Sequence, residues 1–384
     1  MVRNVVILGV TGSLGTSALG VIRRHRERFN IVGIAANRSI DRLVQIADEF
    51  CVKNIGIGNE LALQGNRSLF AAGTNFFIGA NGLNELAALP EADSMLVAIV
   101  GTAGLSPTIT AIERKKTILL ASKEILVVAG KFIIQCAREN NVQLLPVDSE
   151  HNAIFQCLGG NGIESVERLI LTASGGPFRN FSPHKLANVS VSQALQHPIW
   201  KMGKKISIDS ATMANKGLEI IEARWLFDIP ESKIDVLIHP ESIVHSMVQF
   251  RDGCVIAQMS SPDMEIPLAN CLFYPERCPF HGKVVNFSKQ KALTFCEPDG
   301  EKFPALAIAR QCLNAETSGN ACAVFQAANE VAVEKFLRGQ IGFNRIAEII
   351  SETLDLYGGE PMTSFENCMN SVTIAREIAQ SMTP

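Results

Sequence analysis

Two carboxylates in the middle third of the chain directly follow an apolar run. Asp148 and Glu150 come after residues 144–147 in the segment LLPVDSEH. On an extended chain, residues two apart point to the same side, so we expect both carboxylates to face one site. Two like charges this close favour a cation between them, and oxygen ligands favour a hard ion such as Mg²⁺ or Mn²⁺. A surface acidic pair is the alternative, although ligands bind at the carboxyl ends of such apolar strands.

Two further segments offer donors for an anion. Residues 171–177, LTASGGP, read as a strand that ends in a turn of small residues, where amides and the Ser174 hydroxyl can bind an anion. Residues 205–219, KISIDSATMANKGLE, combine Ser210, Asn215 and Lys216 at a predicted helix start. Hydroxyl, amide and ammonium donors together with helix amides suit a phosphate monoester. A capping or surface role is the alternative for each residue taken singly.

A loop between these segments contains one of the two tryptophans of the chain. In HPIWKMG, residues 197–203, Pro198 and Gly203 bracket Trp200. Breakers on both sides argue against a regular element, so we predict a lid that excludes water from a reaction centre. A tryptophan anchored in the core is the alternative. Five of the seven histidines lie between 151 and 245, which also points to this third of the chain.

The elements that must position these groups begin with a nucleotide-binding pattern. The apolar run 5–8 leads into Gly9, Gly12 and Gly15, and a helical stretch then ends near His25. Glycine at these points lets the backbone turn tightly and lets helix amides approach a pyrophosphate. Further apolar strands are predicted at 31–35, 95–100, 117–121 and 143–147, with helical segments between them. This alternation favours a parallel doubly wound sheet, with a purely structural tight turn as the alternative.

The end of the second predicted strand distinguishes between two cofactors. Ala36-Asn37-Arg38-Ser39 stands where an NAD-binding enzyme carries Asp or Glu for the ribose hydroxyls. A cation and two small hydrogen-bonding side chains suit the 2′-phosphate of NADP instead. A solvated loop residue is the alternative for Arg38.

Composition bounds the class of protein. A chain of 384 residues is too long for one ordinary core, and 47% hydrophobic with 19% charged residues indicates a folded protein. A formal charge of −3 argues against a nucleic-acid binder, and no stretch approaches a membrane span. The ten scattered cysteines suit reduced thiols, and the N-terminus has no signal-peptide pattern. We therefore predict a cytoplasmic protein with neither nucleic-acid nor membrane partners.

Six motifs together resemble the 1-deoxy-D-xylulose 5-phosphate reductoisomerase family, the NADPH- and metal-dependent enzymes of the non-mevalonate isoprenoid pathway. They are GVTGSLG, LLASKE, LPVDSEHNAIFQ, LTASGGPFR, HPIWKMGKKISIDSATMANKGLE and HPESIVHSMVQF. The resemblance runs from the first strand to the last helices, and the block 205–219 is its most specific part.

The resemblance implies a role for each residue at a matching position. The metal ligands would be Asp148, Glu150 and Glu219. Residue spacing alone pointed only to the first two of these. The substrate phosphate would be bound by Ser174, His197, Ser210, Asn215 and Lys216. The catalytic group would comprise Lys123, Ser149, Glu150, His151 and His245, with Trp200 and Met202 on a flexible flap. The cofactor would be contacted by Thr11, Gly12, Ser13, Leu14, Ala36, Asn37, Arg38, Ser122, Glu124 and Gly203.

Three positions depart from the family pattern, and all lie near the expected cofactor site. The family's first turn usually reads GSTGSIG, whereas Val10 and Leu14 stand here. The family's usual asparagine before the lysine of its LANKE motif is Ser122 in this chain. A shorter side chain at that position changes any contact with the cofactor.

The resemblance also implies a reaction and an organisation. NADPH and a divalent metal (Mg²⁺, Mn²⁺ or Co²⁺) would serve the rearrangement and reduction of 1-deoxy-D-xylulose 5-phosphate to 2-C-methyl-D-erythritol 4-phosphate. Metal polarisation would promote either a retro-aldol/aldol path or a direct 1,2-shift. The protein would be a homodimer. Two other classes of protein fit the sequence less well. A semialdehyde dehydrogenase needs a nucleophilic cysteine among small residues, and none of the ten cysteines has such neighbours. An NADPH-sensing regulator has no use for three carboxylates and a phosphate pocket.

The predicted fold is α/β in four parts. A Rossmann-like NADPH-binding domain occupies 1–147, a central α/β catalytic domain with the flap 148–272, a linker 273–299 and a helical C-terminal domain 300–384. The linker prediction rests on its prolines and lack of periodicity. The helical prediction rests on apolar residues at helical spacing in 305–313, 321–337, 344–356 and 371–380.

Overall fold

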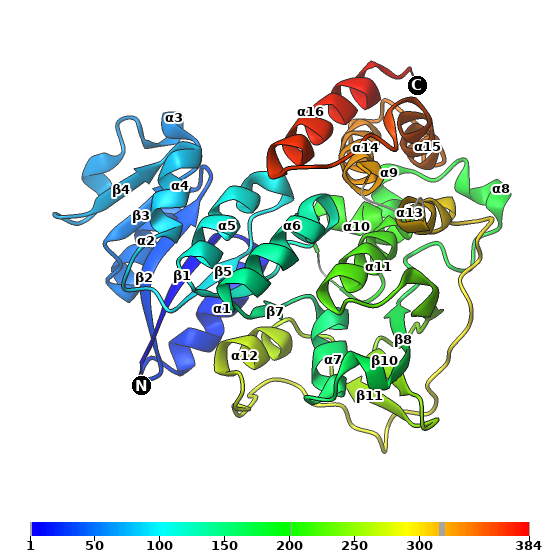
Figure 1. Cartoon of the computed structure of the whole chain (residues 1–384), viewed down its shortest axis with the longest axis horizontal. Coiled ribbons are helices and arrows are strands. Elements are labelled where there is room, and N and C mark those ends of the chain that lie inside the picture. The colour runs from blue at the N-terminus through cyan, green and yellow to red at the C-terminus, as the bar shows by residue number, and fades with distance from the viewer. Residues whose placement is uncertain (1, 201, 315–318, 384) are drawn as a thin grey trace. The chain divides into compact units, whose positions relative to one another are not determined.

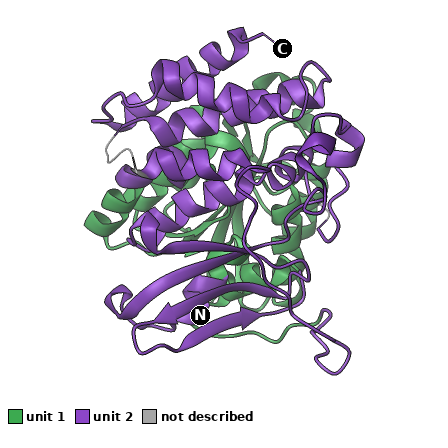
Figure 2. Ribbon diagram, turned by 90° about the vertical axis from the view of Figure 1, so that its right-hand side faces the viewer, with its two compact units in different colours: residues 1–125, 133–152, 263–281 green, residues 126–132, 153–262, 282–384 purple. Residues whose placement is uncertain are grey.

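The computed structural model describes residues 2–200, 202–314 and 319–383 (Figure 1). The chain forms two compact units, coloured separately in Figure 2. Unit 1 comprises residues 1–125, 133–152 and 263–281, and unit 2 comprises residues 126–132, 153–262 and 282–384. No helix among the described residues combines the length and the apolar character needed to cross a membrane.

Unit 1 is built on a seven-stranded sheet in which every pair of neighbours is parallel. The strands are β1 (Arg3–Leu8), β2 (Phe29–Ala36), β3 (Asn54–Ile57), β4 (Asn75–Ile78), β5 (Ser94–Val97), β6 (Thr117–Leu120) and β7 (Leu144–Pro146). Their order is β4-β3-β2-β1-β5-β6-β7, so the direction of winding reverses between β1 and β5. This reversal confirms the predicted doubly wound sheet, and ligands of such sheets bind beside the reversal.

Helices alternate with these strands, as the sequence pattern predicts. They are α1 (Ser13–Arg24), α2 (Ile40–Phe50), α3 (Glu60–Leu63), α4 (Gly79–Ala87) and α5 (Leu105–Glu113), with 3₁₀ turns at Arg67–Leu69 and Gly101–Gly104. Two further helices, α6 (Glu124–Asn140) and α7 (Ser149–Leu158), contain residues of both units. The backbone of α6 is non-helical at Ala129.

The glycines after β1 are required by close backbone approaches. Gly9 has a φ of +86°, and a Cβ there would lie 2.3 Å from the carbonyl oxygen of Ala98. A Cβ on Gly15 would lie 2.5 Å from the carbonyl oxygen of Gly9. The turn therefore stays narrow only with glycine at both positions.

Unit 2 contains a four-stranded mixed sheet of order β11-β10-β8-β9. Its strands are β8 (Val166–Ala173), β9 (Ile234–Ile238), β10 (Val244–Phe250) and β11 (Val255–Met259). Strand β10 runs antiparallel to β8 and β11, and β8 runs parallel to β9. Short 3₁₀ turns at Ile163–Ser165 and Glu231–Lys233 precede β8 and β9.

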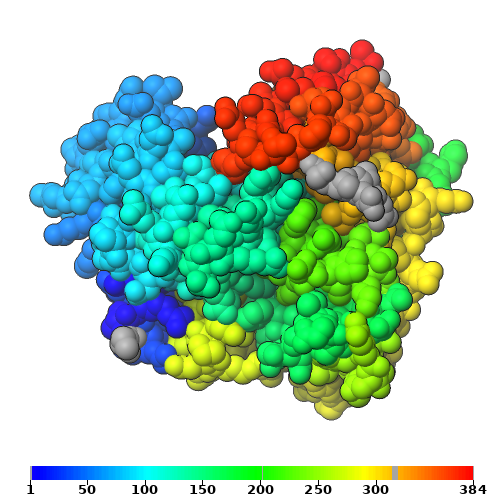
Figure 3. Space-filling model, viewed as in Figure 1, coloured from blue at the N-terminus to red at the C-terminus, as the bar shows by residue number. Residues whose placement is uncertain are grey.

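Helix α11 (Ala214–Leu226) lies between two hydrophobic cores of unit 2. Ile220 and Ala223 of α11 lie in the core of the sheet, whereas Leu218 and Ile221 lie in a second core with the C-terminal helices. Helix α11 is therefore covered on several sides, and its buried residues include the charged Lys216, Glu219 and Glu222. The other helices are α8 (Pro183–Leu186), α9 (Val191–Ala194), α10 (Lys204–Ala211), α13 (Pro304–Asn314), α14 (Ala321–Leu337), α15 (Arg345–Tyr357) and α16 (Phe365–Ser381). In the space-filling view α16 forms part of the surface (red in Figure 3).

The bounds of the two units differ from the four predicted parts. Residues 263–281, split by the prediction between the catalytic domain and the linker, belong to unit 1. Their helix α12 (Glu265–Phe273) packs on α1, where Glu265 pairs with Arg24 and the ring of Phe273 lies 4.9 Å from that of His25. The predicted central and C-terminal parts form one unit because α11 shares a core with α13 and α14.

Candidate functional site

The glycine turn of unit 1 presents helix amides at the end of β1. Thr11 lies in the turn, Gly12 is the N-cap of α1, and Ser13 and Leu14 begin the helix. Gly12 supplies no capping side chain, and the first turn of α1 contains no acidic residue. Gly12 and Ser13 are exposed. The N-terminal amides of α1 are thus suited to a pyrophosphate.

The segment after β2 lies next to this turn in the sheet. Ala36 ends β2, and Asn37 and Arg38 are exposed in the loop before α2. Asn37 packs on Gly58, where a Cβ would lie 2.9 Å from the Asn37 Oδ1. The guanidinium of Arg38 makes no ion pair with any residue that the structure describes. This placement is compatible with the predicted contact to a 2′-phosphate.

Ser122, Lys123 and Glu124 connect β6 to α6 at the same edge of the sheet. The Ser122 hydroxyl donates to the carbonyl oxygen of Ile99, in the segment that follows β5. Lys123 is the N-cap of α6, and Glu124 lies in its first turn. The serine that departs from the family pattern therefore braces the loop after β5.

Lys123 also forms an ion pair with Asp148, and both side chains are largely shielded from solvent. The Lys123 ammonium lies 2.7 Å from Asp148 Oδ2, and His151 Nδ1 lies 3.0 Å from Asp148 Oδ1. Burial acts to raise the pKa of Asp148, but Lys123 and His151 outweigh it and hold that pKa well below its usual range. Asp148 is therefore an ionised carboxylate whose side chain is 12% exposed, and its oxygens can serve as ligands.

The predicted extended geometry of the acidic pair is wrong. Helix α7 begins at Ser149, so Asp148 immediately precedes the helix and Glu150 lies in its first turn. The Asp148 side chain accepts from the Glu150 amide at 3.2 Å, and its carbonyl accepts from the Asn152 amide at 2.8 Å. The Ser149 hydroxyl donates to Glu150 at 2.6 Å. Helix geometry thus places the two carboxylates, because Asp148 caps the helix that contains Glu150.

In unit 2, Ser174 and His197 form a neutral hydrogen-bonded pair. Ser174 follows β8, and its Oγ lies 2.9 Å from His197 Nε2. His197 Nδ1 accepts the amide of Trp200 at 2.8 Å, so the ring proton lies on Nε2 and is donated to Ser174. Burial, assisted by the Arg179 guanidinium, lowers the pKa of His197 to about 4. Since Ser174 Oγ also accepts from the Gly176 amide, its own proton can be donated to an anion.

Ser210 lies directly against the turn that contains Ser174. Gly176 has a φ of +64°, and a Cβ there would lie 2.7 Å from the carbonyl oxygen of Ser210 and 3.2 Å from the Cα of Ala211. The end of α10 and the turn after β8 are therefore in backbone contact. Two predicted phosphate-binding hydroxyls come from these two adjoining segments.

Asn215, Lys216 and Glu219 form one polar cluster at the start of α11. Asn215 Nδ2 donates to Glu219 Oε1 at 2.5 Å, and the Lys216 ammonium donates to Glu219 Oε2. Lys216 and Glu219 are 3% and 1% exposed. The helix begins sharply, because Met213, its N-cap, has a left-handed backbone with φ of +62°. The predicted helix start is confirmed for Asn215 and Lys216, whereas Ser210 lies in the last turn of the preceding helix, α10 (Lys204–Ala211).

The predicted lid lies in irregular chain before α10. Trp200 is partly buried, with its ring 6.3 Å from that of His245, and Met202 and Gly203 follow it, Gly203 being the N-cap of α10. His245 lies on β10 and is buried. Burial lowers its pKa to about 4, against the opposing effect of hydrogen bonds with Ser260 and Ser261. Irregular structure agrees with the prediction of a loop.

The sequence patterns did not predict two charged residues that lie beside His197 and Ser210. Arg179 lies beside His197, and its Cβ would be 2.9 Å from a Cβ on Gly175. Asp209 on α10 is 2% exposed and pairs with Lys205 at 2.7 Å. Arg179 stands in the motif LTASGGPFR, two residues past the turn, which is the only signal for it. Conversely, His239 is structural, because its ring bonds backbone groups of Thr294, Ile243 and Val244.

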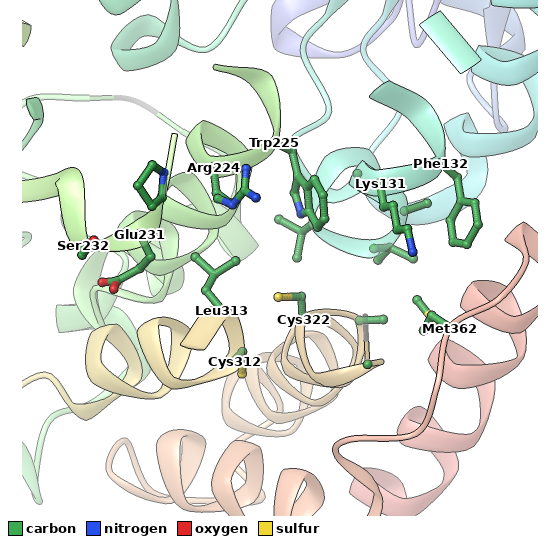
Figure 4. A pocket seen from close by; sticks show the side chains of 17 residues that line it. Lys131, Phe132, Arg224, Trp225, Glu231, Ser232, Cys312, Leu313, Cys322 and Met362 are labelled. Carbon is green, nitrogen blue, oxygen red and sulfur yellow. The ribbon is translucent and has the colours of Figure 1, made fainter. Parts of the chain in front are cut away.

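A cavity of about 640 Å³ in unit 2 lies apart from these residues (Figure 4). It is lined by Trp225, Cys312, Cys322 and Met362, with Lys131 and Arg224 among its polar residues. None of the predicted site residues lines it. Burial raises the pKa of the Cys322 thiol to about 12, so this thiol is unreactive near neutral pH.

The sheet, the glycine turn and the buried polar clusters define a dinucleotide-dependent α/β oxidoreductase. Sequence models of 1-deoxy-D-xylulose 5-phosphate reductoisomerase match residues 5–130, and models of its C-terminal domains match 144–227 and 259–378. Curated reductoisomerases of Chlorobium chlorochromatii and Geobacter metallireducens are each 47% identical to it, covering 100% and 99% of both chains. The chain belongs to the 1-deoxy-D-xylulose 5-phosphate reductoisomerase family.

Solved structures agree with this membership. The reductoisomerase of Zymomonas mobilis in complex with NADPH is 42% identical and superimposes with a TM-score of 0.93 over 99% of both chains. A reductoisomerase in complex with NADPH, fosmidomycin and magnesium is 38% identical, with a TM-score of 0.91 over 99% of this chain and 98% of that one. The predicted family and α/β fold are confirmed, whereas the roles of single residues stay predictions.

Proposed function

We propose that this protein converts 1-deoxy-D-xylulose 5-phosphate to 2-C-methyl-D-erythritol 4-phosphate, with oxidation of NADPH and with a divalent metal. The observation that carries the proposal is family membership along the whole chain, through both units. The reaction consumes one hydride from NADPH and one proton, and it serves non-mevalonate isoprenoid synthesis.

Asp148, Glu150 and Glu219 are the proposed metal ligands. All three offer carboxylate oxygens, the donors that Mg²⁺ and Mn²⁺ prefer. Asp148 suits the role because Lys123 and His151 keep it ionised although its side chain is largely shielded from solvent. A bound divalent ion supplies Lewis-acid polarisation of the substrate oxygens, whether the ion is Mg²⁺, Mn²⁺ or Co²⁺.

The proposed substrate phosphate site is in unit 2, and its members are Ser174, His197, Ser210, Asn215 and Lys216. Support comes from the Ser174 hydroxyl, which already accepts two hydrogen bonds and so donates its proton outward. His197 stays neutral at pH 7 and keeps this serine oriented. Binding of the phosphate, remote from the reacting carbons, orients the substrate for the chemical step.

The remaining predicted residues act around the substrate carbons and the cofactor. We assign Lys123, Ser149, His151 and His245 to the walls of the reaction site. Trp200 and Met202 belong to a flap that excludes water when the substrate binds. NADPH contacts the turn at Thr11, Gly12, Ser13 and Leu14, and Asn37 and Arg38 bind its 2′-phosphate. Ala36, Ser122, Glu124 and Gly203 complete the cofactor site.

The test is turnover with product identification. Purified protein is incubated with NADPH, Mg²⁺ and 1-deoxy-D-xylulose 5-phosphate, and the product is identified by ³¹P and ¹³C NMR. One 2-C-methyl-D-erythritol 4-phosphate per NADPH oxidised is the expected result. NADPH binding without any product would favour a regulatory protein instead.

We further propose a homodimer that pairs through β11. This strand is an edge of its sheet, and Val255, Ile256 and Met259 are exposed along it. An exposed apolar edge strand readily pairs with a second copy about a two-fold axis. Light scattering should give twice the chain mass, and Ile256→Lys should give a monomer, whereas Val284→Lys outside the sheet should not.

The ten free thiols suit a reducing compartment, and we propose the cytoplasm.

A further inference from the structure

A buried polar contact joins α10 to α14 in unit 2. Asn329 Nδ2 on α14 donates to Asp209 Oδ1 at 2.8 Å, across 120 residues of sequence. The other Asp209 oxygen pairs with Lys205 at 2.7 Å. Asn329 is fully buried and Asp209 is 2% exposed. A buried carboxylate is costly unless it is paired, so both partners determine where Asp209 lies.

The position of Asp209 determines the position of the end of α10. Ser210 is the next residue, and its carbonyl oxygen and the Cα of Ala211 lie against Gly176 with no room for a Cβ. Packed interiors transmit small displacements, because there are no voids to absorb them. A shift of α10 therefore moves both Ser210 and the turn that contains Ser174.

The neighbouring amide on the same helix provides a contrast. Gln326, one turn earlier on α14, is fully buried, and neither its Nε2 nor its Oε1 has a hydrogen-bond partner among the described residues. Asn329 Oδ1 likewise has no partner among them. Among the described residues, the Asn329 Nδ2 donates a hydrogen bond to α10 and the Gln326 amide donates none, although both side chains are buried.

We propose that Asn329 is a positioning residue for the substrate phosphate site. It acts through Asp209 and the end of α10, and it touches neither substrate nor cofactor. The helical C-terminal part of the chain thereby contributes to substrate affinity. This inference rests on the proposed phosphate site at Ser174 and Ser210.

The experiment compares Asn329→Leu with Gln326→Leu in the full-length protein. Both substitutions remove a buried amide from α14, but only Asn329→Leu removes the contact with Asp209. KM for the pentulose phosphate, KM for NADPH and kcat are measured for each, with Mg²⁺ present. Isothermal titration with inorganic phosphate needs no turnover, so it tests the inference even if the wild type proves inactive on the pentulose phosphate.

For Asn329→Leu we expect KM for the pentulose phosphate and Kd for inorganic phosphate to rise about tenfold, since a hydrogen bond to a charged group is lost. KM for NADPH should stay within about twofold of the wild type, and kcat should fall less than KM rises, as for lost uniform binding. Gln326→Leu should leave all these constants near the wild type. Should Asn329→Leu fail to fold, Asn329→Ala replaces it.

Equal effects of the Asn329 and Gln326 substitutions would overturn the inference, as would an unchanged phosphate affinity in Asn329→Leu. A parallel loss of NADPH affinity would also count against it, because that pattern indicates general destabilisation. A further outcome is that the wild type does not turn over the pentulose phosphate while phosphate binding still depends on Asn329. That result would refute the proposed function and would still support this inference.

Discussion

The two proposed ligand sites are built in opposite ways. The cofactor turn in unit 1 relies on backbone amides and exposed residues, including Gly12, Ser13 and Arg38. The phosphate site in unit 2 relies on polar side chains that are partly or fully buried: Lys216 is 3% exposed, and the other four members are half-buried. Backbone amides present the same donors whatever side chains surround them, whereas a buried charge depends on each partner it has.

This difference explains where the chain departs from its family. Val10, Leu14 and Ser122 all lie near the cofactor turn, and the backbone geometry there is preserved by Gly9 and Gly15. The motif that contains Asp209, Ser210 and Glu219 follows the family pattern. Substitution should therefore be tolerated in the first region and costly in the second.

Glu219→Gln should have the largest effect. It weakens the proposed metal site, whose Lewis-acid contribution is several kcal/mol, so kcat/KM should fall on the order of 10³-fold. NADPH affinity, measured by fluorescence titration, should be unchanged because the cofactor turn is in unit 1. Glu334→Gln, an exposed glutamate paired with Arg338, is the control and should be silent. A matched loss of NADPH affinity would contradict the metal role.

Gly176→Ala should have the second largest effect. A left-handed backbone costs alanine about 1–2 kcal/mol, and its Cβ would also collide with Ser210, so KM for the substrate should rise roughly 100-fold. Gly300→Ala is the control, since nothing lies within 4 Å of a Cβ there. Steady-state kinetics measure both. If the two variants have the same KM, the contact between the turn after β8 and α10 does not determine the geometry of the phosphate site.

Arg38→Glu should weaken the binding of NADPH and leave the other kinetic constants unchanged. A charge-assisted hydrogen bond is worth about 1.5–3 kcal/mol, so KM for NADPH should rise at least about tenfold while KM for NADH changes little. Arg42→Glu, an exposed residue of α2 that bonds Gln45, is the matched control. Equal changes for NADPH and NADH would refute the assignment to the 2′-phosphate.

His197 should contribute a smaller, pH-dependent effect. Its pKa of about 4 in the folded protein lies below the ordinary value of 6.5, so the unfolded chain binds more protons between these values. The contribution of His197 to the free energy of unfolding should be complete above pH 6.5 and should be lost progressively as the pH drops toward 4. Urea unfolding at pH 7.5, 6 and 5 measures it, and His197→Gln should flatten the decline, whereas exposed His184→Gln should not. An unchanged profile in His197→Gln would contradict a buried neutral imidazole.

Local patterns were sufficient to predict five of the seven strands of unit 1 and the helices at the C-terminus, but they did not predict β3 and β4. The run before Gly9 and the apolar spacing in 321–337 are properties of neighbouring residues, and α14 has the predicted bounds. The extended pair Asp148 and Glu150 was wrong because the same segment also carries a helix-start signal. Aspartate is a preferred N-cap, and glutamate favours the first turn of a helix, as in α7.

Other features depend on partners that are distant in sequence. Helix α12 belongs to unit 1 through contacts such as Arg24 with Glu265, separated by 241 residues. Asn329 reaches Asp209 across 120 residues, and a single asparagine in a helical pattern gives no sign of its partner. Spacing along the chain carries no information about such contacts, so only the folded structure reveals them.

The central claim is that binding of NADPH at the glycine turn does not require the metal on which the chemistry depends. Chelator-treated protein is titrated with NADPH by fluorescence, and NADPH oxidation with 1-deoxy-D-xylulose 5-phosphate is then followed before and after addition of Mg²⁺. NADPH should bind equally well with and without Mg²⁺, but it should not be oxidised until Mg²⁺ is added. Oxidation of NADPH at the full rate without metal, or none after metal is restored, would contradict the claim.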